Sequence, residues 1–431
     1  MAMALNMVRR RCHGIIRQHD NEESYVVAGR SLIDVILRTL FATGAAIAGS
    51  TLVVASAADN YAASDVEAPA WLLPANGRLL AGRARQRLQE APESTDAQHD
   101  ALSLAKVALL REPTAVSAVA TLGLLAELGG DLPAARRRFG YAERLSRRDL
   151  PTELWLIEDA VRREDISGAL QHYDVALRTQ AGSSDILFPV LAKASVDSSV
   201  ASALGRKLMS RPPWGDMFLV FLANGTADPV ATMRFYVDLS RRHLVIPQTA
   251  RSALVSRLID SRKVHDAWAY YVTFHPGADP RRSRDPRFTA SIETPTAFDW
   301  TTSNDPGVTA NIQRGAGSGV AAFSAAPTVG GILMQQTQLL PPGRYRIEGV
   351  SEGIDQQPDE RPYWLLQCSS DGRELGRVEM PNSNEKAGRF AGELNVGADC
   401  PVQALMLVAR PSTASSGLAG AISYVQLAPR N

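Results

Sequence analysis

The feature that most constrains this chain is a set of small and aromatic residues that recurs every 34 positions between residues 101 and 177. The equivalent pairs are Leu122 and Leu156, Asp131 and Asp165, Ala135 and Ala169, Phe139 and Tyr173, and Ala142 and Ala176. A unit of this length cannot bury its apolar face alone, so identical units stack with small residues where helices cross. The spacing therefore predicts a stack of helix pairs.

The residues of this repeat resemble those of the tetratricopeptide family. Leu122-Gly123 lies on the first predicted helix and Gly130-Asp131 at the turn. Ala135, Phe139 and Ala142 follow on the second helix, and Leu156, Ala169, Tyr173 and Ala176 continue the framework one unit later. The resemblance implies an α-solenoid that binds another protein, and it does not identify that protein. We expect the solenoid to span residues 78–277, with a degenerate middle where the 34-residue register is lost.

The N-terminal region has the charge pattern of a membrane protein. Residues 39–58 carry no charge, and 20 residues is about the length of a membrane-spanning helix. Arginines precede this run, and Asp59, Asp65 and Glu67 follow it. The positive-inside rule then predicts a basic cytoplasmic tail (1–30), a transmembrane anchor (31–58), a tether (59–77) and periplasmic C-terminal domains on a bacterial inner membrane. A signal cleaved after Ala57 and a soluble amphipathic helix from Ser31 are the alternatives.

The last third of the chain changes from helical to alternating patterning. After a linker rich in proline and charge (278–287), ten short apolar segments separated by turns follow in residues 288–431. This pattern predicts an antiparallel β-sandwich or jelly roll. The turn Pro341-Pro342-Gly343, between an apolar strand and the aromatic-led Arg344-Tyr345, resembles those of the galactose-binding-like carbohydrate-binding domains. The resemblance implies glycan binding.

Motifs for catalysis are missing from the β-region. All seven histidines precede Ala278, so it has no imidazole for a triad or a histidine metal site. No nucleotide fingerprint opens a helix, and a net charge of +1 gives no global attraction to nucleic acid. We therefore expect no catalytic, cofactor or metal residues. An enzymatic alternative needs only two carboxylates, for which Asp299, Glu348 and Glu393 are available.

Aromatic residues are the candidate glycan contacts, because sugar rings stack on flat side chains. The candidates are Trp300, Tyr345, Tyr363 and Trp364. Since adjacent strand residues face opposite ways, one of Tyr363 and Trp364 must point into the sandwich. Tyr345 and Trp364 also fit a sandwich core.

Two cysteines in the β-region, Cys368 and Cys400, are a candidate disulfide if the compartment is oxidising. Two separate buried thiols are the alternative. Cys12, among the N-terminal arginines, is predicted to stay in the cytoplasm.

Two classes of function fit these patterns. The preferred one is a non-catalytic membrane-anchored envelope protein whose solenoid docks a protein while its β-sandwich binds a polysaccharide, in the manner of helper proteins for surface polysaccharides. The other is a structural scaffold that binds only proteins.

Overall fold

The structure, a computed structural model, describes residues 76–315 and 317–430 together with isolated positions between Thr43 and Ala57. The predicted basic tail, and all but a few positions of the predicted anchor and tether, lie outside the described residues. Among the residues that are described, no helix has the length and apolar character needed to span a membrane. The chain divides between Ala135 and Arg136 into two compact units.

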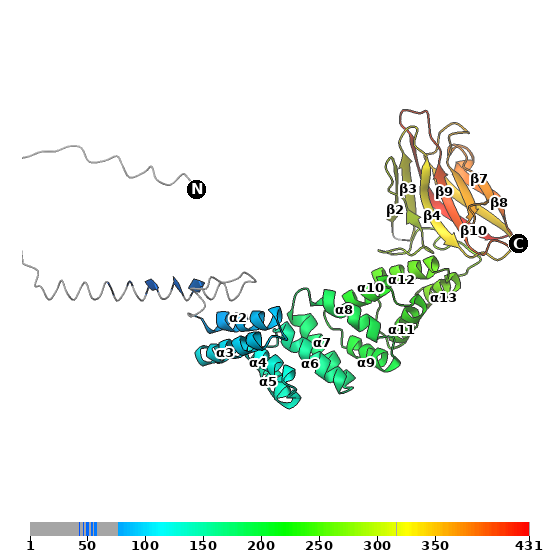
Figure 1. The fold of residues 1–431 in the computed structure, drawn as a ribbon. Coiled ribbons are helices and arrows are strands. Elements are labelled where there is room, and N and C mark those ends of the chain that lie inside the picture. The colour runs from blue at the N-terminus through cyan, green and yellow to red at the C-terminus, as the bar shows by residue number, and fades with distance from the viewer. Residues whose placement is uncertain are drawn as a thin grey trace, which may run out of the picture. The chain divides into compact units, whose positions relative to one another are not determined.

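A run of helices comes first along the chain (Figure 1). The helices are α2 (Gly77–Glu90), α3 (Thr95–Arg111), α4 (Val116–Leu128), α5 (Leu132–Leu145), α6 (Leu150–Arg162), α7 (Ile166–Thr179), α8 (Ser183–Ala194), α9 (Ser198–Met209), α10 (Gly215–Asn224), α11 (Pro229–Arg241), α12 (Gln248–Asp260) and α13 (Val264–Phe274). The lengths of these helices and their short connections are those of stacked helix pairs.

The 34-residue repeat has a local structural cause at the helix starts. Asp131 accepts a hydrogen bond from the backbone N–H of Ala134 at 2.9 Å, and Asp165 accepts one from that of Gly168 at 2.8 Å. Each aspartate therefore caps the second helix of its unit. The preceding residue takes a positive φ in both turns, 79° at Gly130 and 57° at Glu164. The repeat in sequence is thus a repeat of turn and cap.

The repeated framework is also the packing framework. Ala135, Phe139, Ala142 and Ala176 are completely covered. Ala169 and Tyr173 are 5% and 7% exposed, Gly123 is buried, and Leu122 and Leu156 are half-buried. The ring of Phe139 stacks on Trp155 with centroids 4.2 Å apart. The predicted helical region is confirmed, whereas its tetratricopeptide identity stays a prediction.

The strands follow the helices and form two antiparallel five-stranded sheets. They are β1 (Thr301–Thr302), β2 (Val308–Arg314), β3 (Gly319–Ala325), β4 (Gly331–Gln338), β5 (Gly343–Glu352), β6 (Tyr363–Cys368), β7 (Glu374–Glu379), β8 (Arg389–Val396), β9 (Gln403–Ala409) and β10 (Leu418–Pro429). One sheet has the order β1-β4-β9-β6-β7 and the other β2-β3-β10-β5-β8. The predicted β-sandwich is confirmed at this level.

Period-2 patterning places the sandwich core between the two sheets. Along β5, Tyr345, Ile347 and Ser351 are buried while Arg346 and Glu348 are exposed. The core gathers apolar side chains from both sheets, including Trp364, Leu366 and Leu405 from one and Ile347, Ile422 and Val425 from the other. Alternation along each strand is sufficient to explain this burial.

The connection between helices and sandwich is buried around Arg284, whose side chain is 8% exposed. Its Nε donates to the Phe298 carbonyl at 2.8 Å, and its Nη1 donates to Gln338 Oε1 at 3.0 Å. The guanidinium also donates to the Thr337 carbonyl and lies 5.4 Å from the Trp268 ring centroid. Burial lowers the pKa of Arg284 to about 10, so the group is still charged at neutral pH.

A second buried contact joins the last helix to the sandwich. The Tyr271 hydroxyl on α13 donates to Asp299 Oδ1 at 2.7 Å, and Asp299 Oδ2 accepts from the hydroxyl and backbone N–H of Thr296. Phe298 belongs to the same hydrophobic cluster as Tyr271 and the neighbouring helices. The end of the helical region and the β-sandwich are therefore held together by a buried polar network next to an aromatic cluster.

Candidate functional site

Three of the four predicted glycan contacts are core residues. Trp300, Tyr345 and Trp364 are 5%, 3% and 0% exposed. The indole N–H of Trp300 donates to the Asp285 carbonyl at 3.2 Å, and the hydroxyl of Tyr345 donates to the Pro341 carbonyl at 2.8 Å. Strand alternation turns Tyr345 and Trp364 into the sandwich, and Trp300, which precedes β1, packs against Phe288 and Trp364. The structure therefore places these three rings in the core and not on the surface.

Tyr363 is the one of the four that reaches the surface, and its ring is flanked by cations. The guanidinium carbons of Arg377 and Arg410 lie 4.2 Å and 4.4 Å from its centroid. Both terminal nitrogens of Arg410 also bind the Glu379 carboxylate at 2.6 Å. These hydrogen bonds raise the pKa of Arg410. The result is a small charged aromatic patch on the outer face of the sheet.

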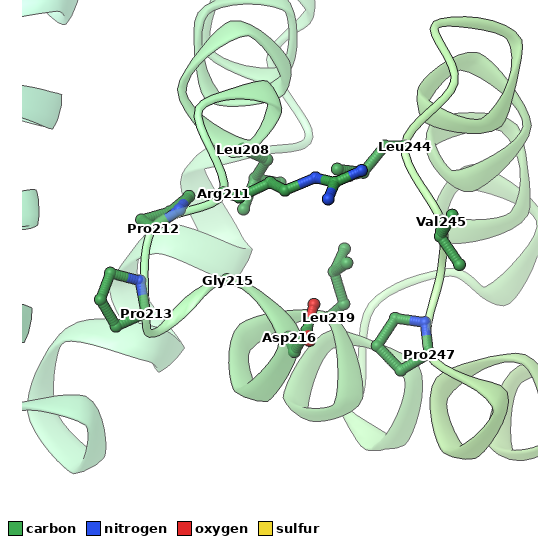
Figure 2. Close-up of a pocket in the computed structure, with 10 residues that line it drawn as sticks. All are labelled: Leu208, Arg211, Pro212, Pro213, Gly215, Asp216, Leu219, Leu244, Val245 and Pro247. Atoms are coloured by element: carbon green, nitrogen blue, oxygen red, sulfur yellow. The ribbon is translucent and has the colours of Figure 1, made fainter.

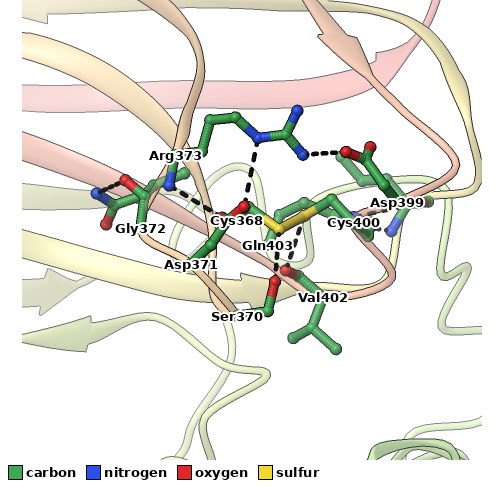
Figure 3. The surroundings of a disulfide bond; sticks show 11 residues. Cys368, Ser370, Asp371, Gly372, Arg373, Asp399, Cys400, Val402 and Gln403 are labelled. Atoms are coloured by element: carbon green, nitrogen blue, oxygen red, sulfur yellow. Dashed lines mark hydrogen bonds and ion pairs between the residues drawn. A yellow bond between two sulfur atoms is a disulfide. The ribbon is translucent and has the colours of Figure 1, made fainter.

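The two cysteines of the β-region are joined. Cys368 ends β6 and Cys400 lies just before β9, the strand that pairs with β6. Their Cα atoms are 5.8 Å apart and the sulfurs form a disulfide that closes a loop of 32 residues. Figure 3 shows the ion pair between Arg373 and Asp399 beside the bridge. The bridge joins the end of β6 to the segment just before β9 and leaves neither thiol free.

An open pocket lies between two turns of the helical region. Its volume is about 410 Å³, and Figure 2 shows the residues that line it. They are Leu208, Arg211, Pro212, Pro213, Gly215, Asp216, Leu219, Leu244, Val245 and Pro247. We call this the docking pocket. It belongs to the turn between α9 and α10 and to the segment that connects α11 to α12.

Proline and backbone geometry shape both walls of the docking pocket. On one wall, α9 ends at Met209, Arg211 takes a φ of 50°, and Pro212-Pro213 prevents the helix from continuing. On the other wall, Leu244 and Ile246 are buried while Val245, between them, is 73% exposed. This alternation holds the connecting segment extended. The break between α9 and α10 therefore falls at Pro212-Pro213.

The docking pocket combines an apolar floor with one unpaired cation. Leu208, Leu219 and Leu244 are 2%, 1% and 9% exposed and form the floor. Arg211 extends from its turn toward Leu244 (Figure 2). Within residues 76–315 and 317–430, no carboxylate forms an ion pair with Arg211. Such a site can accept an apolar side chain with an anionic group next to it.

A hub next to the docking pocket fixes the helices that carry it. Asp174 on α7 accepts from Arg178 Nε at 2.7 Å, from Trp214 Nε1 at 2.9 Å and from Lys207 Nζ at 3.2 Å. Burial raises the pKa of Asp174, but these hydrogen bonds outweigh it and hold the pKa below its ordinary value. The hub ties α7 to α9 and to the start of α10, the two helices that flank the Pro212-Pro213 wall of the pocket.

Sequence reasoning identified neither the docking pocket nor a group that could hold a metal ion. Glu143, Glu153 and His172 place possible ligand atoms within 4.8 Å of one another. They come from three helices, and their separations along the sequence, 10 and 19 residues, match no metal-binding sequence motif. The pocket lies where the 34-residue register is lost, so its only signal in the sequence was the proline pair.

Comparisons with known proteins give no family. No protein family model matches the chain, and no curated protein sequence matches it. Solved structures with similar parts include the enzymatically active domain of bacteriophage CBA120 tailspike protein 4, with 12% identity and a TM-score of 0.24 over 35% of this chain and 22% of that one. A glycosylation-associated protein complex (Gap123) from Streptococcus agalactiae gives 11% identity and a TM-score of 0.21 over 30% of this chain and 40% of that one.

A carbohydrate-binding module (CBM6) from Cellvibrio mixtus lichenase 5A, solved with cellotriose, gives 9% identity and a TM-score of 0.21 over 31% of this chain and 98% of that one. This chain thus spans less than half of the tailspike protein and of the Gap123 chain. The structural neighbours include a carbohydrate-binding module and a glycosylation accessory protein. At these TM-scores the likenesses carry no argument about what this chain binds.

Proposed function

We propose that this chain is a non-catalytic docking protein whose helical region binds an extended segment of a partner protein in the docking pocket. The observation that carries the proposal is the unpaired Arg211 beside a floor of three leucines. Buried leucines favour one apolar side chain, and the guanidinium favours a carboxylate next to it. The expected partner segment therefore presents a large apolar residue beside an Asp, a Glu or a chain terminus.

The proposal places the helical region and the β-sandwich outside the cytoplasm, on a protein anchored through residues 31–58. Two observations support this location. Arginines precede the uncharged run and acidic residues follow it, and Cys368 is bridged to Cys400. Structural disulfides persist in oxidising compartments and are rare in the cytosol. The tetratricopeptide resemblance supports the protein-docking role in the same way.

A peptide-display selection tests the docking proposal. A random peptide library is selected on the full chain, and the affinity of the enriched peptides is measured for the wild type and two variants. Arg211→Glu should weaken binding at least about tenfold, because it replaces attraction by repulsion. Arg206→Glu, at an exposed position on α9, is the matched control and should bind like the wild type. Binding that both variants retain would reject the docking pocket.

Glycan binding by the β-sandwich is a second candidate function, favoured by Tyr363 alone. Its half-buried ring lies against the guanidinium groups of Arg377 and Arg410, which pair with Glu374 and Glu379. The candidate therefore rests on stacking of a sugar against the exposed part of the ring. A glycan array probed with the full chain and with Tyr363→Ala separates this function from a scaffold that binds only proteins. Signals that require Tyr363 support it, and an array without signals favours the scaffold.

A further inference from the structure

Three side chains from successive helices meet at a buried point in the helical region. Glu143 lies on α5, Glu153 near the start of α6, and His172 on α7. The Nδ1 atom of His172 is 2.9 Å from Glu153 Oε2 and 3.8 Å from Glu143 Oε1. The side chains of His172, Glu143 and Glu153 are 16%, 26% and 0% exposed. The group is therefore reachable from solvent on the side of Glu143 and closed on the side of Glu153.

Glu153 carries the evidence that something further binds there. Its carboxylate is completely buried, and its Oε1 atom has no hydrogen-bond partner among the described residues. A buried carboxylate costs several kcal/mol unless its oxygens are paired. The hydrogen bond with His172 satisfies Oε2 only. An ion pair between His172 and the two glutamates would leave Oε1 unpaired in the same way.

The spacing of the three side chains suits a tetrahedral cation. With bonds of about 2.0 to 2.1 Å, ligand atoms around zinc are about 3.3 Å apart. The two distances from His172 Nδ1, 2.9 Å and 3.8 Å, lie on either side of that value. Small rotations of the carboxylates would equalise them. One imidazole and two carboxylates also form a ligand set of zinc, whereas calcium and magnesium prefer oxygen alone.

We propose that Glu143, Glu153 and His172 bind a divalent cation of the zinc class, with the fourth position open to water. The cation joins α5, α6 and α7, so it locks one repeat to the next. Its positive charge compensates the buried negative charge of the Glu153 carboxylate. The site is separate from the docking pocket, whose lining residues come from α9, α10, the turn between them and the segment that connects α11 to α12.

Calorimetric titration of the full, untagged chain with zinc chloride tests this site, with calcium and magnesium chloride as separate arms. We expect one equivalent of zinc to bind at the site and calcium and magnesium to bind much more weakly. Glu153→Gln and His172→Gln should each weaken zinc binding at least tenfold, since even changes next to a metal ligand cost about 10- to 100-fold. Glu158→Gln, at an exposed position on α6, makes the same charge change and should bind zinc like the wild type.

Circular dichroism of each variant shows whether it folds. If Glu153→Gln does not fold, the half-exposed Glu143→Gln replaces it, with the same expected loss. The proposal is overturned if the wild type takes up no zinc. It is also overturned if the ligand variants that fold bind zinc as the wild type does, or if calcium binds more tightly than zinc.

Discussion

The helical region and the β-sandwich differ in how completely they bury their apolar side chains. Within residues 76–315 and 317–430, the large hydrophobic side chains that stay exposed all lie in the helical region. They are Val107, Leu110, Leu128, Tyr141, Val161, Ile186, Val190, Val196, Met209, Met217 and Val245. In the sandwich, even Trp300 and Trp364 are covered. Exposed apolar side chains that are scattered singly are ordinary on a protein surface. The docking role therefore rests on the docking pocket, whose lining includes the exposed Val245.

The contrast follows from how each part closes. A stack of helix pairs buries one face of each unit against its neighbours and leaves its turns open along the array. Two facing sheets enclose a core between them, and in this sandwich a disulfide also links the ends of two paired strands, β6 and β9. A part built from stacked units therefore offers pockets at its turns, as between α9 and α10, whereas the closed sandwich offers its outer surface.

The largest effect is expected at the junction of the two parts. Arg284→Ala removes the donor to the carbonyls of Phe298 and Thr337 and to Gln338 Oε1, and leaves them buried without a partner. At about 1 kcal/mol or more for each acceptor, plus lost packing, we expect destabilisation of about 4 kcal/mol or more. Denaturant unfolding measures it.

The matched control for this substitution is Arg282→Ala, because the Arg282 side chain is 58% exposed. It should change the free energy of unfolding by less than about 1 kcal/mol. If Arg284→Ala were equally mild, the helices and the sandwich would be held together by something other than this network.

Loss of the disulfide should be the next largest effect and should fall on the sandwich. Cys400→Ser opens a loop of 32 residues, which corresponds to about 3 to 4 kcal/mol on the chain-entropy estimate. The melting temperature of the variant under oxidising conditions should match that of the reduced wild type. If the melting temperature of the wild type were the same with and without reductant, the bridge would be contradicted.

Overpacking a helix crossing should cost less and should act on the helical region. Ala169 is 5% exposed and Ala135 is fully buried, so leucine at either position needs space that the crossing does not have. We expect Ala169→Leu and Ala135→Leu to destabilise by about 1 to 3 kcal/mol. Ala194→Leu, at the exposed end of α8, is the control. Equal melting temperatures for all three variants would reject the assigned crossing positions.

The smallest effect is a pH dependence at the end of the helical region. Burial lowers the pKa of His275 below its ordinary value of 6.5, Asp299 opposes the shift, and Arg251 adds to it. Between the lowered pKa and 6.5 the unfolded chain binds more protons than the folded one, so stability falls as the pH falls below about 6.5. His275→Gln should flatten this slope in thermal melts at several pH values, and His265→Gln, exposed on α13, should keep it.

Periodicity in the sequence predicted the elements of this structure better than its sites. The aspartates at 131 and 165 cap α5 and α7 because the cap is a local interaction between residues three positions apart. Alternation likewise required one of Tyr363 and Trp364 to face inward, and Trp364 does. The turn predicted at Gly130-Asp131 and the inward-facing ring predicted at positions 363 and 364 both depend only on neighbours in sequence.

The candidate sites depend on residues that are distant in sequence. The docking pocket joins Arg211 to Val245, and the predicted cation site joins Glu143 to His172. Arg211 and Val245 are 34 residues apart, but both lie in connecting segments where the repeated framework residues are lost, and Glu143 and His172 are 29 residues apart. The packing of the helices is therefore what brings each set together. The burial of Trp300 and Tyr345 could not be predicted for a related reason, because an aromatic residue looks the same in the sequence whether it lines a surface or a core.

The most direct test of the docking role is photo-crosslinking from the docking pocket in the cells that make this protein. A benzophenone amino acid is placed at position 245, where Val245 is 73% exposed, or at position 161 on α6, where Val161 is 61% exposed. The account predicts a discrete crosslinked partner from position 245 that is absent from position 161 and is lost when Arg211→Glu is added. The same products from both positions, or no product from position 245, would contradict it.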